Sequence, residues 1–120
     1  METQKQGESG LYDSYSWSLS NANHYQALSV SNYKSPTTFD YDAGLVGVGE
    51  NAKATLLKKK SVALQGTTGR EALFAVKALQ IRSRMYFKNN RLYHIIYVGP
   101  NGELETSEVD AFFDSFRFKH

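Results

Sequence analysis

The segment of residues 80–98 constrains the fold of this chain more than any other part of the sequence. Before Asn89-Asn90, apolar or small residues alternate with Arg and Tyr, which is the two-residue period of a β-strand. After the Asn pair, a second apolar run continues to residue 98. Because asparagine tolerates a positive φ, the pair favours a two-residue hairpin turn. The sequence therefore predicts an antiparallel hairpin in which Lys88 lies opposite Arg91.

This register divides the hairpin side chains between two faces. One face is predicted to carry Ile81, Ser83, Met85, Phe87, Leu92, His94, Ile96 and Val98. The other is predicted to carry Arg82, Arg84, Tyr86, Tyr93, Ile95 and Tyr97. Alternating cations and aromatic rings can neutralise phosphates, stack on bases or bind an acidic ligand. The candidate binding residues are therefore Arg82, Arg84, Tyr86, Tyr93 and Tyr97, and the alternative is a structural set of cross-strand cation–π pairs beneath a helix.

Positive charge is concentrated in the middle of the chain. The whole sequence has a formal net charge of only +2, but residues 53–91 contain ten Lys or Arg residues and a single acidic residue, Glu71. Such a segment can form a basic surface for an acidic partner. The alternative is that these cations lie on the solvated face of ordinary strands.

Four further strands are predicted from short aromatic or β-branched runs between turn residues. They are expected at Tyr12–Leu19, Tyr25–Tyr33, Thr55–Leu64 and Arg70–Val76, with turns at Asn21-Ala22-Asn23 and at Gln65–Gly69. Residues 1–10 lack apolar periodicity and are expected to form a disordered tail. The remaining residues 11–120 are expected to form a single domain.

A first helix is predicted after Ser35-Pro36, capped by Thr37 or Thr38 and extending to about Ala52. Its apolar positions at helical spacing are Phe39, Ala43 and Val46. Gly44, Gly47 and Gly49 each disfavour a helix by about 1 kcal/mol relative to alanine. A loop with a short helical start is therefore the alternative for this segment.

A second helix is predicted near the C-terminus, after a turn at Gly99-Pro100-Asn101-Gly102. Thr106 or Ser107 is the expected N-cap, and acidic residues follow in the first turn. Its apolar stripe consists of Val109, Phe112, Phe113 and Phe116. We expect this stripe to close the apolar face of the hairpin.

Composition excludes several classes of protein. The sequence contains no cysteine, which removes disulfides, thiolate metal sites and cysteine nucleophiles together. No apolar run approaches the roughly 18 residues that a membrane span needs, and residues 1–10 have no signal-peptide pattern. The compartment stays open, and an exported or periplasmic lipoprotein whose leader has been removed is one alternative.

Residues that could support catalysis or bind a metal do not form a recognisable motif. The histidines, His24, His94 and His120, lack the short spacing typical of metal sites, and His94 is expected to be buried and hydrogen-bonded. Asp40 and Asp42 fit the first turn of a helix better than a cation site. No metal and no cofactor is therefore expected. A Ser-x-x-Lys pattern at residues 31–34 lacks the accompanying motifs of serine acyl enzymes, and the glycines at 44–49 do not form a dinucleotide fingerprint.

Several short motifs together indicate a family. They are Thr68-Gly69-Arg70-Glu71, Asn90-Arg91-Leu92-Tyr93, Val98-Gly99-Pro100 and the segment Phe112–Phe118. The chain resembles bacterial proteins of the PsbP-like superfamily, which also contains a eukaryotic Ran-binding import factor. The resemblance implies an α+β fold, an α/β/α sandwich with a central antiparallel sheet and flanking helices. Relatives begin with a strand that ends in a Phe-Pro-Gly type turn, so the sequence is interpreted as lacking a native first strand.

The function favoured by these observations is that of a noncatalytic accessory domain that binds a protein partner. The resemblance transfers no catalytic residue, because the shared motifs are turns and core positions. A monomer is expected, with peripheral membrane association as an open possibility. Two alternatives remain: a small-ligand-binding protein or hydrolase with a pocket between sheet and helix, and a single-stranded nucleic-acid binder that uses the Arg/Tyr face, which is the less favoured partner class.

Overall fold

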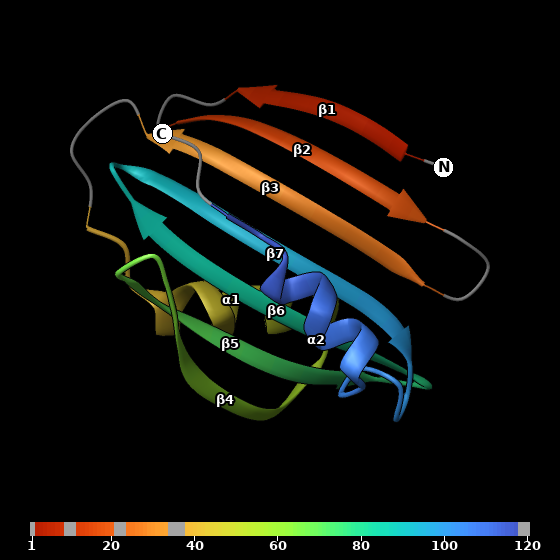
Figure 1. The fold of residues 1–120 in the computed structure, drawn as a ribbon. Helices are drawn as coiled ribbons and strands as arrows, with labels where there is room; N and C mark the ends of the chain where they lie inside the picture. The colour runs from red at the N-terminus through yellow and green to blue at the C-terminus, as the bar shows by residue number, and fades with distance from the viewer. Residues whose placement is uncertain (1, 9–11, 21–23, 34–37, 118–120) are drawn as a thin grey trace.

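The computed structural model describes residues 2–8, 12–20, 24–33 and 38–117, which form one antiparallel sheet and two α-helices (Figure 1). The strands are β1 (Glu2–Glu8), β2 (Tyr12–Ser20), β3 (Tyr25–Tyr33), β4 (Thr55–Leu64), β5 (Thr67–Val76), β6 (Leu79–Lys88) and β7 (Arg91–Pro100). The helices are α1 (Tyr41–Ala52) and α2 (Ser107–Asp114). The seven strands follow the order β1-β2-β3-β7-β6-β5-β4, so β1 and β4 are the edge strands.

The hairpin predicted around Asn89-Asn90 is confirmed in position and register. Strands β6 and β7 pair with Lys88 opposite Arg91 and continue without a shift to Ile81 opposite Val98. The φ angles of Asn89 and Asn90 are 53° and 62°, the left-handed conformation that asparagine tolerates. The hairpin therefore presents the two side-chain faces that the sequence predicts.

The two helices pack against opposite faces of the sheet. On one face, Leu45 of α1 belongs to a buried cluster with Ile81 and Met85 of β6. On the other face, Val109 and Phe113 of α2 pack with Tyr86, Ile95 and Tyr97. In the view of Figure 1, α2 lies in front of the sheet and α1 behind it.

This arrangement corrects the predicted position of the C-terminal helix. The N-cap at Thr106 and the buried Val109 and Phe113 agree with the prediction. However, α2 covers the Arg/Tyr face of the hairpin, and α1 covers the apolar face. The hairpin pattern alone did not distinguish these cases, because the stems of arginine and the rings of tyrosine also bury large apolar areas.

Helix α1 forms in spite of its glycines because two of them allow close packing. A Cβ at Gly44 would lie 2.7 Å from Cζ of Phe39, and one at Gly49 would lie 3.1 Å from Cε1 of Phe74. The predicted cap at Thr37 or Thr38 is wrong, since Asp40 is the N-cap and accepts a hydrogen bond from the amide of Ala43. The predicted apolar face is also rotated, because Leu45 and Gly49 are buried while Val46 is 56% exposed.

The N-terminal half of the sheet contains one unpredicted strand. Residues 1–10 were expected to be a disordered tail, but Glu2–Glu8 pair along the whole length of β2, from Glu2 opposite Leu19 to Glu8 opposite Asp13. A polar edge strand is stabilised by its main-chain ladder, and therefore gives no apolar periodicity in the sequence. The predicted pairing of the next two strands is confirmed, whereas their predicted turn at residues 21–23 lies outside the described residues.

Candidate functional site

The five predicted binding residues lie on one face of the β6–β7 hairpin, and this face is covered. Arg82 and Arg84 are 5% and 7% exposed, and Tyr86 is 2% exposed. Tyr97 is buried and Tyr93 is half-buried, in contact with the ring of Phe116. These side chains therefore do not form an accessible surface, because α2 and the residues that follow it lie over them, and this burial agrees with the structural alternative of a set beneath a helix.

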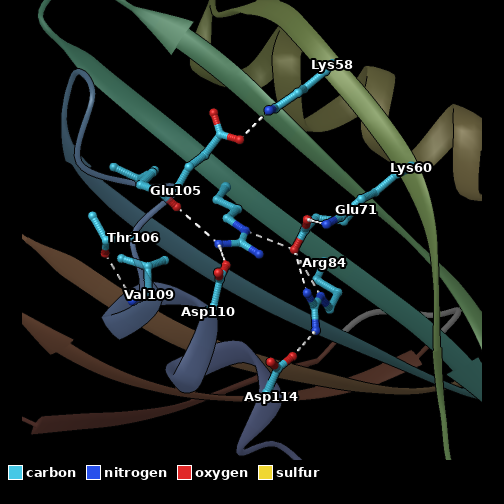
Figure 2. A network of polar contacts seen from close by, with 11 residues as sticks. Lys58, Lys60, Glu71, Arg84, Glu105, Thr106, Val109, Asp110 and Asp114 are labelled. Atoms are coloured by element: carbon cyan, nitrogen blue, oxygen red, sulfur yellow. Dashed lines mark hydrogen bonds and ion pairs between the residues drawn. The ribbon is translucent and has the colours of Figure 1, made fainter.

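Glu71 is the centre of a buried ionic network beneath α2. This carboxylate extends from β5 and is 5% exposed. Its Oε1 accepts hydrogen bonds from Nε of Arg82 at 2.9 Å and from Nε of Arg84 at 3.0 Å, with Nη2 of Arg84 at 2.8 Å. Figure 2 shows Glu71 and Arg84 directed toward each other from neighbouring strands. Two guanidinium groups thus share one carboxylate oxygen.

The same two arginines also bind the second helix. Nη1 of Arg82 donates to Oδ1 of Asp110 at 2.6 Å and to the carbonyl of Leu104 at 3.1 Å. Nη1 of Arg84 donates to Oδ1 of Asp114 at 3.3 Å, as drawn in Figure 2. The network therefore connects β5, β6 and α2. Its hydrogen bonds hold the helix against the sheet.

The electrostatics of the network favour the charged forms. Burial alone would raise the pKa of Glu71, but the hydrogen bonds and positive charges of Arg82 and Arg84 outweigh it and lower this pKa below its ordinary value. Burial likewise opposes the charge on Arg84, yet its contact with Glu71 raises the pKa of the guanidinium. Burial raises the pKa of the neighbouring Tyr86, so its hydroxyl stays protonated. None of these groups is poised to exchange a proton near neutral pH.

A serine and a histidine form a pair on the opposite face of the hairpin. Oγ of Ser83 lies 2.5 Å from Nε2 of His94, and burial lowers the pKa of His94 to about 4. The predicted hydrogen bond of His94 is present, and by exposed area the residue is half-buried rather than fully buried. Ser83 has no exposed surface, so it is out of reach of a substrate. The pair is therefore a satisfied hydrogen bond inside the domain and not an accessible catalytic pair.

The other candidates for metal or catalytic chemistry do not come together. Asp40 caps α1, and Asp42 pairs with Lys59 at 3.4 Å. His24 lies 3.8 Å from Glu103, and His120 is outside the described residues. Within the described ranges, no group of three or more acidic or histidine side chains could hold a metal ion. Of the helices in this part of the chain, none is long and apolar enough to cross a membrane.

Strand β4 is the most accessible part of the basic segment. Lys58, Lys59 and Lys60 are consecutive on this edge strand, and their side chains are 60%, 51% and 63% exposed. Each approaches one carboxylate, namely Glu105, Asp42 and Glu71 respectively. Figure 2 shows Lys58 and Lys60 extending from this edge toward the side of the sheet that carries α2.

Two clefts flank β4, one on each face of the sheet. The β4–α2 cleft, of about 210 Å³, is lined by Lys58, Lys60, Glu71, Arg82, Glu105 and Asp110 among others. The α1–β4 cleft, of about 350 Å³, is mostly apolar and is lined by Leu45, Val46, Gly49, Leu56, Lys59 and Phe74 among others. Val46, Leu56 and Leu57 are large apolar side chains that are exposed around this strand. Exposed lysines, exposed apolar side chains and two clefts therefore occur together around β4.

Sequence reasoning missed both Glu71 and the β4 edge. Glu71 is the single acidic residue within the basic segment, and its position in a strand next to the arginines was the available signal. The edge position of β4 gives no such signal, because it depends on the order of strands in the sheet.

Comparison with known proteins supports the fold and gives no function. Comparisons with models of protein families and with curated proteins found no match. Among solved structures, the chain is similar to PA94 from Pseudomonas aeruginosa, a protein of unknown function for which a regulatory role has been suggested. The two share 10% sequence identity over 98% of each chain, with a TM-score of 0.60. A likeness at this identity shows the fold alone, a compact α+β fold with an antiparallel sheet.

Proposed function

We propose that this chain is a noncatalytic accessory domain of the PsbP-like type that binds another protein through its β4 edge. The proposal joins the family resemblance of the sequence to the exposed surface of the structure. An antiparallel sheet with α1 on one face and α2 on the other is the arrangement that an α/β/α sandwich of this type requires. The domain would act by contact rather than by chemistry.

The observation that carries the proposal is the composition of the β4 edge. Three exposed lysines and the exposed apolar side chains of Val46, Leu56 and Leu57 surround a strand that pairs on one side only in the described chain. Apolar anchors beside charged groups on an accessible edge are typical of a protein-binding surface.

The buried networks argue against the other functions. A nucleic-acid binder needs accessible rings and cations, but the Arg/Tyr set lies beneath α2. A hydrolase needs a reachable nucleophile and base, but Ser83 is fully buried beside His94. These arrangements stabilise the domain and leave its surface as the functional part.

The proposal is tested by identifying a partner and rebuilding the complex from purified components. The wild-type domain and a Lys58→Glu/Lys60→Glu variant are used to capture proteins from a lysate of the source organism. Lys77→Glu/Arg91→Glu is the control, because it makes the same charge change at two exposed residues outside β4, one in the β5–β6 turn and one at the start of β7. We expect a protein that the wild type and the control retain and the β4 variant loses.

The captured protein is then purified, and its binding to the domain is measured by isothermal titration calorimetry. A saturable complex of defined stoichiometry supports the proposal. If no purified candidate binds the wild-type domain, the protein-binding function is rejected. If the β4 variant binds a purified partner as tightly as the wild type, the function stands but its assignment to β4 is wrong.

A further inference from the structure

The outer side of β4 is long and regular enough to accept another strand. A bulge at Leu57 interrupts the pairing with β5, but from Lys58 opposite Leu73 to Leu64 opposite Thr67 the register is continuous. Seven consecutive residues thus have regular strand geometry. No described strand pairs with their outer side. Such an edge offers main-chain donors and acceptors to an extended peptide.

The side chains of the three lysines alternate between the two clefts. Lys58 pairs with Leu73, whose side chain belongs to the cluster beneath α2, and Lys60 follows on the same face, where it reaches Glu71. Lys59 pairs with Ala72, which belongs to the cluster beneath α1, and it lines the apolar α1–β4 cleft. The edge therefore presents Lys58 and Lys60 toward α2, each beside a carboxylate of the domain, and a mainly apolar cleft toward α1.

The alternation of the three lysines predicts which side chains a strand paired with β4 would carry on each face. In an added strand, the residues opposite Lys58 and Lys60 project toward α2, and the residue between them projects toward α1. We infer that β4 binds an extended acidic-apolar-acidic segment of another protein, which adds to the sheet as a further strand. The two acidic side chains pair with Lys58 and Lys60, and the central apolar side chain enters the α1–β4 cleft beside Val46 and Leu56. This inference rests on the proposed protein-binding function.

The present contacts of the lysines leave them available to such a ligand. The ion pairs of Lys58 with Glu105 and of Lys59 with Asp42 are exposed at both partners, so solvent screens them. Replacing one carboxylate partner by another therefore costs little free energy. Lys60 contacts Glu71, which already accepts hydrogen bonds from both arginines of the network. Exchange of these partners for ligand carboxylates does not involve the hydrogen bonds that Arg82 and Arg84 donate to Oε1 of Glu71.

Charge also distinguishes a heterologous ligand from a second copy of the chain. Two copies that paired edge to edge with Lys59 at the centre of the pairing would place three lysines of one beside three lysines of the other. Like charges opposite each other across two strands are destabilising. Lysines on an edge strand therefore oppose self-association. A ligand strand with acidic side chains avoids this repulsion between lysines.

The inference is tested with a blocked seven-residue peptide whose central residues are Glu-Leu-Glu. Matched peptides carry Lys-Leu-Lys or Leu-Glu-Leu at the centre, and a fourth carries Glu-Leu-Glu with N-methylated alternate amides. Binding is measured by fluorescence anisotropy, and the site is mapped by amide chemical shifts. We expect the unmodified Glu-Leu-Glu peptide to bind at least tenfold more tightly than the other three, with shifts concentrated at residues 56–64.

Two variants separate charge recognition from loss of fold. Lys58→Glu/Lys60→Glu should lose at least tenfold in affinity for the Glu-Leu-Glu peptide and gain affinity for Lys-Leu-Lys. Lys58→Gln/Lys60→Gln keeps the polar surface without reversed charge and should lose affinity for the acidic peptide without this gain. Lys77→Glu/Arg91→Glu should bind as the wild type does.

The results that would overturn the inference are distinct from those that reject the proposed function. Equal binding of the N-methylated peptide would exclude strand addition, because this peptide lacks main-chain donors that pairing with β4 needs. Shifts confined to another surface, or no binding of Glu-Leu-Glu at millimolar concentration, would also reject it. A purified partner that still binds the domain would then leave the protein-binding function standing without this mode of recognition.

Discussion

The ring of Phe113 in α2 lies against the guanidinium group of Arg82 in β6, with 4.7 Å between Cζ and the ring centroid. Arg84 makes the same type of contact at 5.1 Å. One aromatic ring thus covers two cations whose charges are balanced from the side by Glu71. This contact explains how an amphipathic helix packs on a sheet face that contains arginines: their planar groups stack on the ring while their N–H groups are hydrogen-bonded.

Replacement of Phe113 by alanine should destabilise the domain by about 3–5 kcal/mol, because it leaves a cavity under α2 and removes the ring from both arginines. The free energy of unfolding is measured by urea titration. Phe112→Ala is the matched control, since Phe112 is only half-buried on the same helix, and it should cost less. A loss below about 1 kcal/mol for Phe113→Ala would show that α2 does not stabilise this face.

Replacement of Glu71 by glutamine should also cost about 3–5 kcal/mol, because it leaves the buried guanidinium groups of Arg82 and Arg84 without their shared carboxylate. The lowered pKa of Glu71 means that the carboxylate stabilises the fold above its unfolded pKa and that this stabilisation is lost as pH falls. Denaturation at pH 7 measures the cost. Glu105→Gln, which removes an exposed carboxylate beside Lys58, should change stability by no more than about 1 kcal/mol. Equal effects of the two variants would contradict the central role of Glu71.

The stability of the domain should fall in mild acid because of His94. Burial lowers the pKa of His94 from 6.5 to about 4, so the unfolded chain binds more protons than the folded chain between these values. Stability is therefore greatest above about pH 6.5 and should decrease by about 2 kcal/mol between pH 7 and pH 5 through this group. Urea titrations at several pH values measure the slope. A His94→Gln variant, which keeps a hydrogen-bonding partner for Ser83, should lose this part of the slope; an unchanged slope would assign it to other groups.

Two glycine-to-alanine variants should have effects of opposite sign. A Cβ at Gly69 would lie 2.2 Å from the carbonyl oxygen of Met85, so Gly69→Ala forces β5 and β6 apart and should cost at least about 2 kcal/mol. A Cβ at Gly47 in α1 meets no atom within 4 Å, so Gly47→Ala should stabilise the helix by roughly 0.5–1 kcal/mol. Thermal unfolding of both variants distinguishes them. A tolerated Gly69→Ala would show that the two strands are less closely packed than the structure indicates.

Local sequence determined the elements whose signals are local. The pair Asn89-Asn90 specified a two-residue turn, and this turn fixed the register of β6 and β7 because side chains alternate with an invariant period of two. The N-cap at Thr106 and the apolar stripe of α2 could likewise be predicted from local sequence. Strand β1 was missed because its stability comes from main-chain pairing with β2 and has no apolar pattern to reveal it.

The tertiary structure alone decided which helix covers which face, and therefore which residues are accessible. From the sequence, Arg82 and Arg84 were the best candidates for a binding surface, since an arginine pair in a strand is usually solvated. They are buried because Glu71, from a neighbouring strand, and Asp110 and Asp114, from α2, complete their hydrogen bonds at one place. Such compensation joins residues up to 30 positions apart, and no local pattern encodes it. The lysines of β4 stayed accessible for the complementary reason, because the order of strands left them at the edge of the sheet.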